Sequence, residues 1–150
     1  MVAPCGRFFC VAEKASSQAV GRNLARIRRA IGMTSRVLAM STSELGVPLS
    51  SSGISDIEKG RRTVSVDQLT CLAACLGVSP IALLNPEVSD PDAEVELSGT
   101  SPETAAAMTD WLRGEQSLTD ELLDDHEREA FRRQSLPEWL WNREGVTDGR

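Results

Sequence analysis

Apolar residues recur along this chain at the intervals of an α-helix, and the period first appears at residue 20. The apolar positions are Val20, Leu24, Ile27 and Ile31, which are four, three and four residues apart. This spacing places them on one helical face, and Gly32 predicts the end of the helix. Residues 1–17 carry no such period, so we expect a flexible N-terminal arm there.

Two shorter helices are expected next. Thr34 predicts the start of the second helix, because its hydroxyl can accept a hydrogen bond from a free amide of the next turn. The positions expected to face the core from this helix are Val37, Leu38 and Leu45. The third helix is predicted from Gly53 to Lys59, with Ile54 and Ile57 facing inward and Gly60 at its end. Its candidate caps are Ser50, Ser51 and Ser52.

A fourth and a fifth helix close this region. Ser65 and Gln68 match a capping box, in which each side chain bonds the backbone amide of the other residue. The apolar stripe behind it consists of Leu69, Leu72, Ala73 and Leu76. Ser79 and Pro80 then predict a short helix from Ile81 to Leu84, since proline is favoured in a first turn. Because five short helices follow one another without a strand pattern, we predict an all-α fold.

The rest of the chain is expected to form an acidic helical extension. Residues 87–100 are acidic, with five Asp/Glu, and predict a linker with a short extended piece at 95–97. Ser101-Pro102 predicts the start of a helix that ends near Leu112. Further helices are expected from Leu118 to about Arg133 and after residues 135–138. The predicted division is therefore an arm (1–17), a helical domain (18–86), a linker (87–100) and an extension (101–150).

The charge of the chain is divided at this linker. The net charge is −6, which by itself argues against a nucleic-acid partner. Residues 1–86, however, hold ten Lys/Arg and five Asp/Glu, whereas residues 87–150 hold six Arg and seventeen Asp/Glu. Such an asymmetry is typical of a nucleic-acid-binding part joined to an acidic part.

Several classes of protein are excluded by composition. No apolar run is long enough for a transmembrane helix, and the patch at residues 8–12 is too short for a secretion signal, so we expect a cytoplasmic protein. The single histidine, His126, offers little for acid–base chemistry, and we expect neither an enzyme nor a cofactor. Four cysteines allow a four-thiolate metal site: Cys5, Cys10, Cys71 and Cys75. The favoured interpretation is that Cys71 and Cys75 are small buried side chains beside the leucines of the fourth helix.

Four segments occur in a specific order within residues 20–84. They are residues 24–34, Leu38-Ala39, residues 54–62 (ISDIEKGRR) and residues 69–84 (LTCLAACLGVSPIALL). This pattern resembles the Xre/Cro/CI-type helix-turn-helix family, which implies a five-helix lambda-repressor-like domain. Six residues separate Ala39 from Gly46, where the family commonly has three, so the second helix or its turn is expected to be longer. In this the chain resembles an elongated actinobacterial form, some members of which carry a segment like residues 111–115.

The resemblance implies that the third helix lies in the major groove of DNA, with its first residues nearest the bases. The candidate DNA-binding residues are Ser35, Arg36, Ser50, Ser51, Ser52, Ser55, Asp56, Lys59, Arg61 and Arg62. Lys59, Arg61 and Arg62 are expected to contact phosphates. Asp56 can accept from a cytosine amino group or can pair with a neighbouring arginine, and both interpretations stay open. Glu58 fits a position that makes an internal polar contact.

The resulting hypothesis is a sequence-specific DNA-binding transcriptional regulator. It would act as a repressor and a homodimer on a near-palindromic operator, with two recognition helices about 34 Å apart. It would be nucleoid-associated through its DNA. The alternative is a protein-interaction module, an antitoxin or anti-repressor, whose acidic half binds a partner. Its aromatic residues would serve such a partner or the protein's own packing: Trp111, Phe131, Trp139 and Trp141.

A self-cleaving repressor is the least favoured class. Such repressors need a serine activated by a lysine in the part that follows the linker. The chain has two lysines, Lys14 and Lys59, and both precede residue 87.

Overall fold

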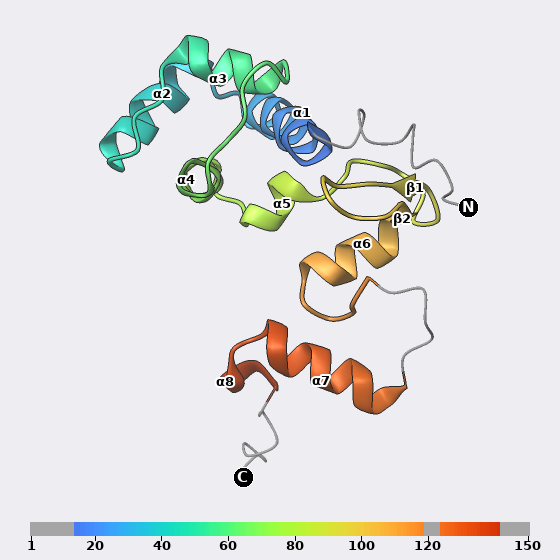
Figure 1. Ribbon diagram of the computed structural model, residues 1–150. Helices are drawn as coiled ribbons and strands as arrows, with labels where there is room; N and C mark the ends of the chain where they lie inside the picture. The colour runs from blue at the N-terminus through green and yellow to red at the C-terminus, as the bar shows by residue number, and fades with distance from the viewer. Residues whose placement is uncertain (1–13, 119–123, 142–150) are drawn as a thin grey trace, which may run out of the picture.

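The computed structural model describes residues 14–118 and 124–141, and their fold is mostly helical (Figure 1). Five helices form the first unit, and their order and approximate bounds agree with the sequence. They are α1 (Ala15–Ala30), α2 (Ser35–Glu44), α3 (Ser51–Glu58), α4 (Val66–Leu76) and α5 (Pro80–Leu84). The prediction of an all-α fold is confirmed for the described residues, apart from one small hairpin.

The starts of these helices are fixed by side-chain caps. Thr34 accepts from the amide of Val37, as expected, and Ser65 and Gln68 form the predicted capping box. Of the three serines before α3, Ser50 is the cap, because its hydroxyl accepts from the amide of Gly53 at 3.0 Å. Each cap satisfies an amide that the first turn of a helix leaves without a partner.

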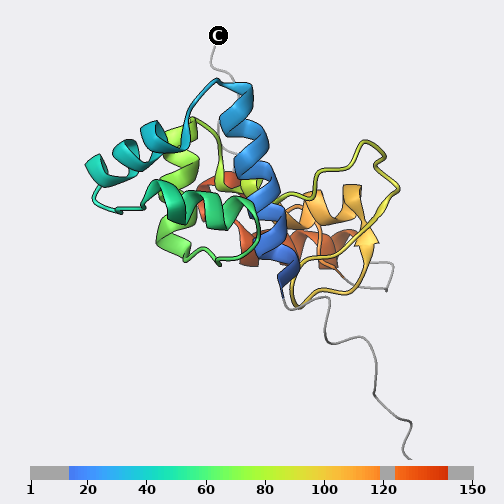
Figure 2. The same ribbon diagram turned by 90° about the horizontal axis from the view of Figure 1, so that it is seen from above.

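One apolar core lies between the five helices. Its buried members come from all five helices and from the turn before α3: Leu24, Ile27, Leu38, Leu49, Ile54, Ile57, Leu72, Ala73, Leu76 and Leu83. These include most of the predicted stripe positions. Helices α2 and α4 both pack against this core, and α1 crosses behind α3 (Figure 2).

Three residues expected in the core are on the surface. Ile31 is 53% exposed, Val37 48% and Leu45 57%. Ile31 and Leu45 are the C-caps of α1 and α2, so the backbone no longer keeps them on the apolar face. The buried face of α2 is instead formed by Leu38 and Thr42, four residues apart, which directs Val37 toward solvent.

The additional residues before Gly46 lengthen α2 itself. This helix has ten residues and continues through the Ser/Thr-rich stretch. The hydroxyls of Thr42 and Ser43 donate to the carbonyl oxygen of Ala39, at 3.0 and 2.9 Å. Thr42 is fully buried, so this bond pairs a hydroxyl that would otherwise be desolvated without a partner.

The structure departs from the expected arm and linker. Helix α1 begins at Ala15, so residues 15–17 are helical rather than part of a flexible arm. Within the expected linker, β1 (Glu94–Val95) pairs in antiparallel register with β2 (Glu103–Thr104). The extended piece expected at 95–97 is thus confirmed in part by β1, and its alternate residues Val95 and Leu97 are buried.

This hairpin and α6 (Ala105–Leu112) pack on α1. Their buried cluster consists of Ala19 on α1 with Val95, Leu97, Ala105 and Met108. At its edge, the amide of Ser16 donates to the hydroxyl of Ser98, and the amide of Ser98 donates to the hydroxyl of Ser16. In Figure 2, α2 and α3 lie on one side of α1, and the hairpin with α6 lies on the other.

The C-terminal helices begin later than expected. Thr104, rather than Ser101, caps α6 by accepting from the amide of Ala107, because residues 103 and 104 belong to β2. Leu118 lies in a loop, Leu122 and Leu123 fall outside the described residues, and α7 (Asp125–Ser135) starts at a capping box. A last helix, α8, spans Glu138–Trp141.

Two of the aromatic residues of this extension pack within the chain. Trp111 and Phe131 are half-buried and line one groove beside Ile81 and Leu136. Trp139 on α8 is 67% exposed. None of the described helices is both long and apolar enough to cross a membrane.

Candidate nucleic-acid interface

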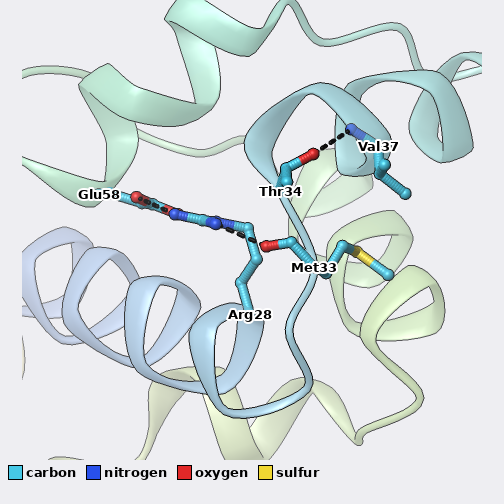
Figure 3. A network of polar contacts seen from close by, with 5 residues as sticks. All are labelled: Arg28, Met33, Thr34, Val37 and Glu58. Carbon is cyan, nitrogen blue, oxygen red and sulfur yellow. Dashed lines mark hydrogen bonds and ion pairs between the residues drawn. The ribbon is translucent and has the colours of Figure 1, made fainter.

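A largely buried ion pair joins α1, the turn before α2, and the end of α3. Arg28 donates from Nε and Nη2 to the two carboxylate oxygens of Glu58, at 2.6 and 3.0 Å, and from Nη1 to the carbonyl oxygen of Met33 at 2.6 Å (Figure 3). The hydrogen bond to Glu58 raises the pKa of Arg28, while burial opposes this. The expected internal role of Glu58 agrees with this contact, which fixes α3 relative to α1 and α2.

The inner face of α3 is buried and packs closely against α1. Ile54 and Ile57 are fully buried, and the backbone of Ile57 lies directly against Gly21 of α1. A Cβ at residue 21 would overlap the carbonyl oxygen of Ile57, so only glycine allows this close approach. The sequence signal for this contact is a glycine in the middle of a helical pattern.

The first turn of α3 brings three of the candidate DNA-binding residues together. The hydroxyls of Ser50 and Ser52 are 3.1 Å apart. The guanidinium of Arg62 folds back to this turn, since a Cβ placed on Gly53 would be 2.9 Å from its Nη1 and 3.1 Å from the Ser50 hydroxyl. Arg62 therefore lies beside the start of α3, although it follows the helix in sequence.

Asp56 and Arg61 form a second pair on the outer side of α3. Arg61 donates to Oδ1 of Asp56 from Nε at 3.0 Å and from Nη2 at 2.5 Å. The turn after α3 produces this pairing. Gly60 adopts a left-handed φ of +69°, and the amide of Arg61 then bonds the carbonyl oxygen of Asp56, which returns the chain over the helix. Of the two interpretations of Asp56, the arginine pair is the one present in the structure.

The remaining candidates are separate positions on α2 and α3. Ser35 and Arg36 form the first turn of α2, and Ser51 and Ser55 belong to α3. Lys59 is the C-cap of α3 and is exposed. Within the described residues, no ion pair is formed by Arg36, Lys59 or Arg62, and all three residues are exposed.

Asn23 was not singled out by the sequence, although it connects the two parts of the fold. It is buried, and its Nδ2 donates to the carbonyl oxygens of Leu83 at 3.0 Å and Asn85 at 2.7 Å. The side chain of Asn85 in turn accepts from Thr109 on α6 at 2.9 Å. A polar residue on the inner side of an otherwise apolar helical pattern is the signal that points to such a role.

The cysteines of α4 form a pair on one helical face. Cys71 is buried and Cys75 is half-buried, four residues further along. Burial, followed by the neighbouring Cys71 and by Glu44, raises the pKa of Cys75 to about 11. Among the described residues no group of three or more metal-ligating side chains occurs, and Cys5 and Cys10 lie outside them.

Comparisons with known proteins give one solved structure. No protein-family model matches the chain, and a search of curated proteins also gives no match. The chain is similar to the crystal structure of the restriction-modification controller protein C.AhdI from Aeromonas hydrophila. The sequence identity is 29%, the match covers 46% of this chain and 97% of that chain, and the TM-score is 0.41.

Proposed function

We propose that this protein is a sequence-specific DNA-binding transcriptional regulator and that α3 is its recognition helix. The observation that carries the proposal is the construction of α3. Two isoleucines and the Arg28–Glu58 pair anchor its inner side, while its outer side carries hydroxyls and charged groups. A recognition helix needs this division, because it must be held rigidly while its outer side chains reach the base edges.

The distribution of charge supports the same proposal. Positive charge without an ion-pair partner lies on α2 at Arg36, at the end of α3 at Lys59, and in the following turn at Arg62. These are the positions where the protein would contact the phosphates of DNA. The acidic residues of the hairpin segment lie on the other side of α1, away from α2 and α3 (Figure 2). The acidic charge of the hairpin segment therefore lies away from the proposed face.

We further propose a homodimer that binds a near-palindromic operator, with repression by occupancy alone. In a two-fold dimer, two copies of α3 would contact half-sites separated by one helical turn, about 34 Å. Each half-site contact uses the same residues, so the operator symmetry follows from the protein symmetry.

The test is binding to duplex DNA at several salt concentrations, followed by fluorescence anisotropy. The full chain should prefer some duplexes over bulk DNA, with affinity falling steeply as salt rises. Lys59→Ala should weaken binding to all duplexes alike and reduce the slope of log affinity against log salt by about one. Arg113→Ala, which removes an exposed charge at the end of α6, is the matched control and should change neither. A slope near zero for the full chain would overturn the proposal.

One observation favours the alternative of a protein-interaction module: the large exposure of Trp139. Exposed tryptophans frequently mark interfaces, since they contribute much of the binding energy there. Sedimentation of the wild type and of Trp139→Ser separates the possibilities. Loss of a dimer in the variant assigns Trp139 to self-association. A folded full chain that binds no DNA would favour the interaction module.

A further inference from the structure

The groove-facing side of α3 offers little that distinguishes one base from another. Its candidate residues are mostly serines, and a hydroxyl both donates and accepts, so it pairs with any base edge. Discrimination between bases in the major groove comes mainly from bidentate groups, of which arginine with guanine is the commonest. The side chains that can supply such selectivity must therefore come from the charged groups around α3.

We propose that Arg61 is the residue that recognises a guanine and that Asp56 is the positioning residue that orients it; this rests on the proposed function. The carboxylate of Asp56 takes the Nε–H and one Nη2–H of the guanidinium, both through Oδ1. A guanidinium has five N–H donors, so three stay available. Two of them, on Nη1 and Nη2, point away from the carboxylate along the outer edge, and this edge matches O6 and N7 of guanine.

The charge of the pair separates this role from that of a phosphate contact. Arg61 and Asp56 together are neutral, so the pair attracts a phosphate only weakly, and the carboxylate repels it. The free N–H groups of the guanidinium can still donate directional hydrogen bonds to a base. The bound carboxylate even favours this, because it fixes the plane of the guanidinium. The pair is thus suited to recognising a base and poorly suited to neutralising the backbone, whereas Arg62 and Lys59 keep unpaired charge.

Both side chains are accessible enough for this role. The side chain of Arg61 is 59% exposed and that of Asp56 is 42% exposed. The turn that joins them is set by backbone hydrogen bonds from the amides of Arg61 and Arg62 to the carbonyl oxygen of Asp56, at 2.8 and 3.2 Å. Substitutions of either side chain leave these bonds in place, so the turn should survive them.

The experiment is selection of bound duplexes from a random pool by the full-length wild type, followed by affinities for the selected site with each base at one position. The wild type should select a guanine at a fixed position of each half-site. Arg61→Lys keeps the charge but loses the bidentate edge, and should reduce this preference about tenfold while leaving the other positions unchanged. Arg62→Lys is the matched control and should keep the guanine.

Asp56→Ala provides a readout that a purely structural role would not give. Removing the carboxylate should raise the affinity for non-specific duplex while lowering the guanine preference. In the Arg61→Ala background, the same substitution should leave that preference unchanged. Thermal melting of each variant checks that the fold is retained.

The two proposals fail in different ways. A selected site whose consensus is the same for the wild type and Arg61→Ala would overturn the role of Arg61 and leave the regulator in place. A uniform loss of affinity across all duplexes in Arg61→Ala would assign it to phosphate and also overturn the inference. A folded wild type that selects no sequence would overturn the proposed function together with the inference.

Discussion

Arg28 on α1 and Glu58 at the last residue of α3 are joined by two parallel hydrogen bonds, and only 12% and 7% of their side chains are exposed. The same guanidinium holds the carbonyl oxygen of Met33, just before α2. One side chain therefore connects three segments whose relative orientation sets the position of α3. Its importance is structural, and it can be measured apart from any DNA.

Removing either partner of this pair should destabilise the protein. Glu58→Ala leaves the guanidinium without its carboxylate in a poorly hydrated place, which costs about 3 kcal/mol in the free energy of unfolding. Arg28→Ala should give a loss of similar size, and the double variant should lose less than the sum of the two. Urea unfolding followed by circular dichroism measures all three, and additive losses would contradict the pairing.

Gly21→Ala should destabilise the fold although alanine is the better helix former. Helix propensity alone would stabilise the variant by up to about 1 kcal/mol. The overlap with the carbonyl oxygen of Ile57 should outweigh this gain and push α3 away from α1. The matched control is Arg22→Ala at the neighbouring exposed position, which should change the melting temperature little. A stabilised Gly21→Ala variant would show that α1 and α3 are not in this contact.

Asn23→Asp should be destabilising in a pH-dependent manner. The substitution replaces an amide donor by a carboxylate that faces the carbonyl oxygens of Leu83 and Asn85. Burial and these oxygens disfavour the charged form. The guanidinium of Arg26, which donates to the other side-chain oxygen at 3.2 Å, offsets this only in part. The variant should therefore gain stability as the pH falls and the carboxyl becomes protonated. Thermal melting between pH 4 and pH 8 measures this. Asn23→Ala should lower the free energy of unfolding by about 2 kcal/mol. This loss should be the same at every pH, because alanine has no titratable group.

Cys75 should react slowly with alkylating agents. With a pKa of about 11 instead of the ordinary 9.0, its thiolate fraction at pH 8 is about a hundredfold lower than that of a free cysteine. Iodoacetamide labelling resolved by peptide mass spectrometry should show this difference, and denaturant should abolish it. A labelling rate equal to that of a free thiol would contradict the burial of this group.

The same pKa shift predicts a loss of stability at alkaline pH. The folded state holds the proton of Cys75 more tightly than the unfolded state does. The protonated thiol therefore makes its full contribution to the free energy of unfolding below about pH 9, and this contribution is lost as the pH rises toward 11. Cys75→Ala should remove this part of the pH dependence of unfolding. An unchanged slope in the variant would assign the alkaline loss to other groups.

Local signals located the helices of the first unit well. Caps such as Ser65 with Gln68 act within one turn, and the stripe at Leu69, Leu72 and Leu76 depends only on the helical period. Such features need no knowledge of distant parts of the chain. The bounds predicted from them agree with the structure to within a few residues.

The misplaced residues are those whose environment depends on another element. Val95 and Leu97 lie in an acidic stretch that indicates a linker, yet they are buried because α1 and α6 are near. Ile31, by contrast, continues an apolar period but lies beyond the end of its helix, where no partner covers it. Apolar periodicity and local composition do not predict which surfaces of the folded chain will pack together.

The sequence by itself determined the order of the helices, their caps, the serine-rich outer side of α3 and the separation of charge at the linker, because each of these is encoded within a few neighbouring residues. Tertiary structure decided which polar groups pair. Arg28 pairs with Glu58, which is thirty residues away, and Asn23 donates to the carbonyl oxygen of Leu83 in α5. Arg61 pairs with Asp56 because the turn at Gly60 reverses the chain. These pairings depend on the packing of α1 against α3 and on a backbone reversal, and a hydrogen bond forms only where the fold brings donor and acceptor within reach.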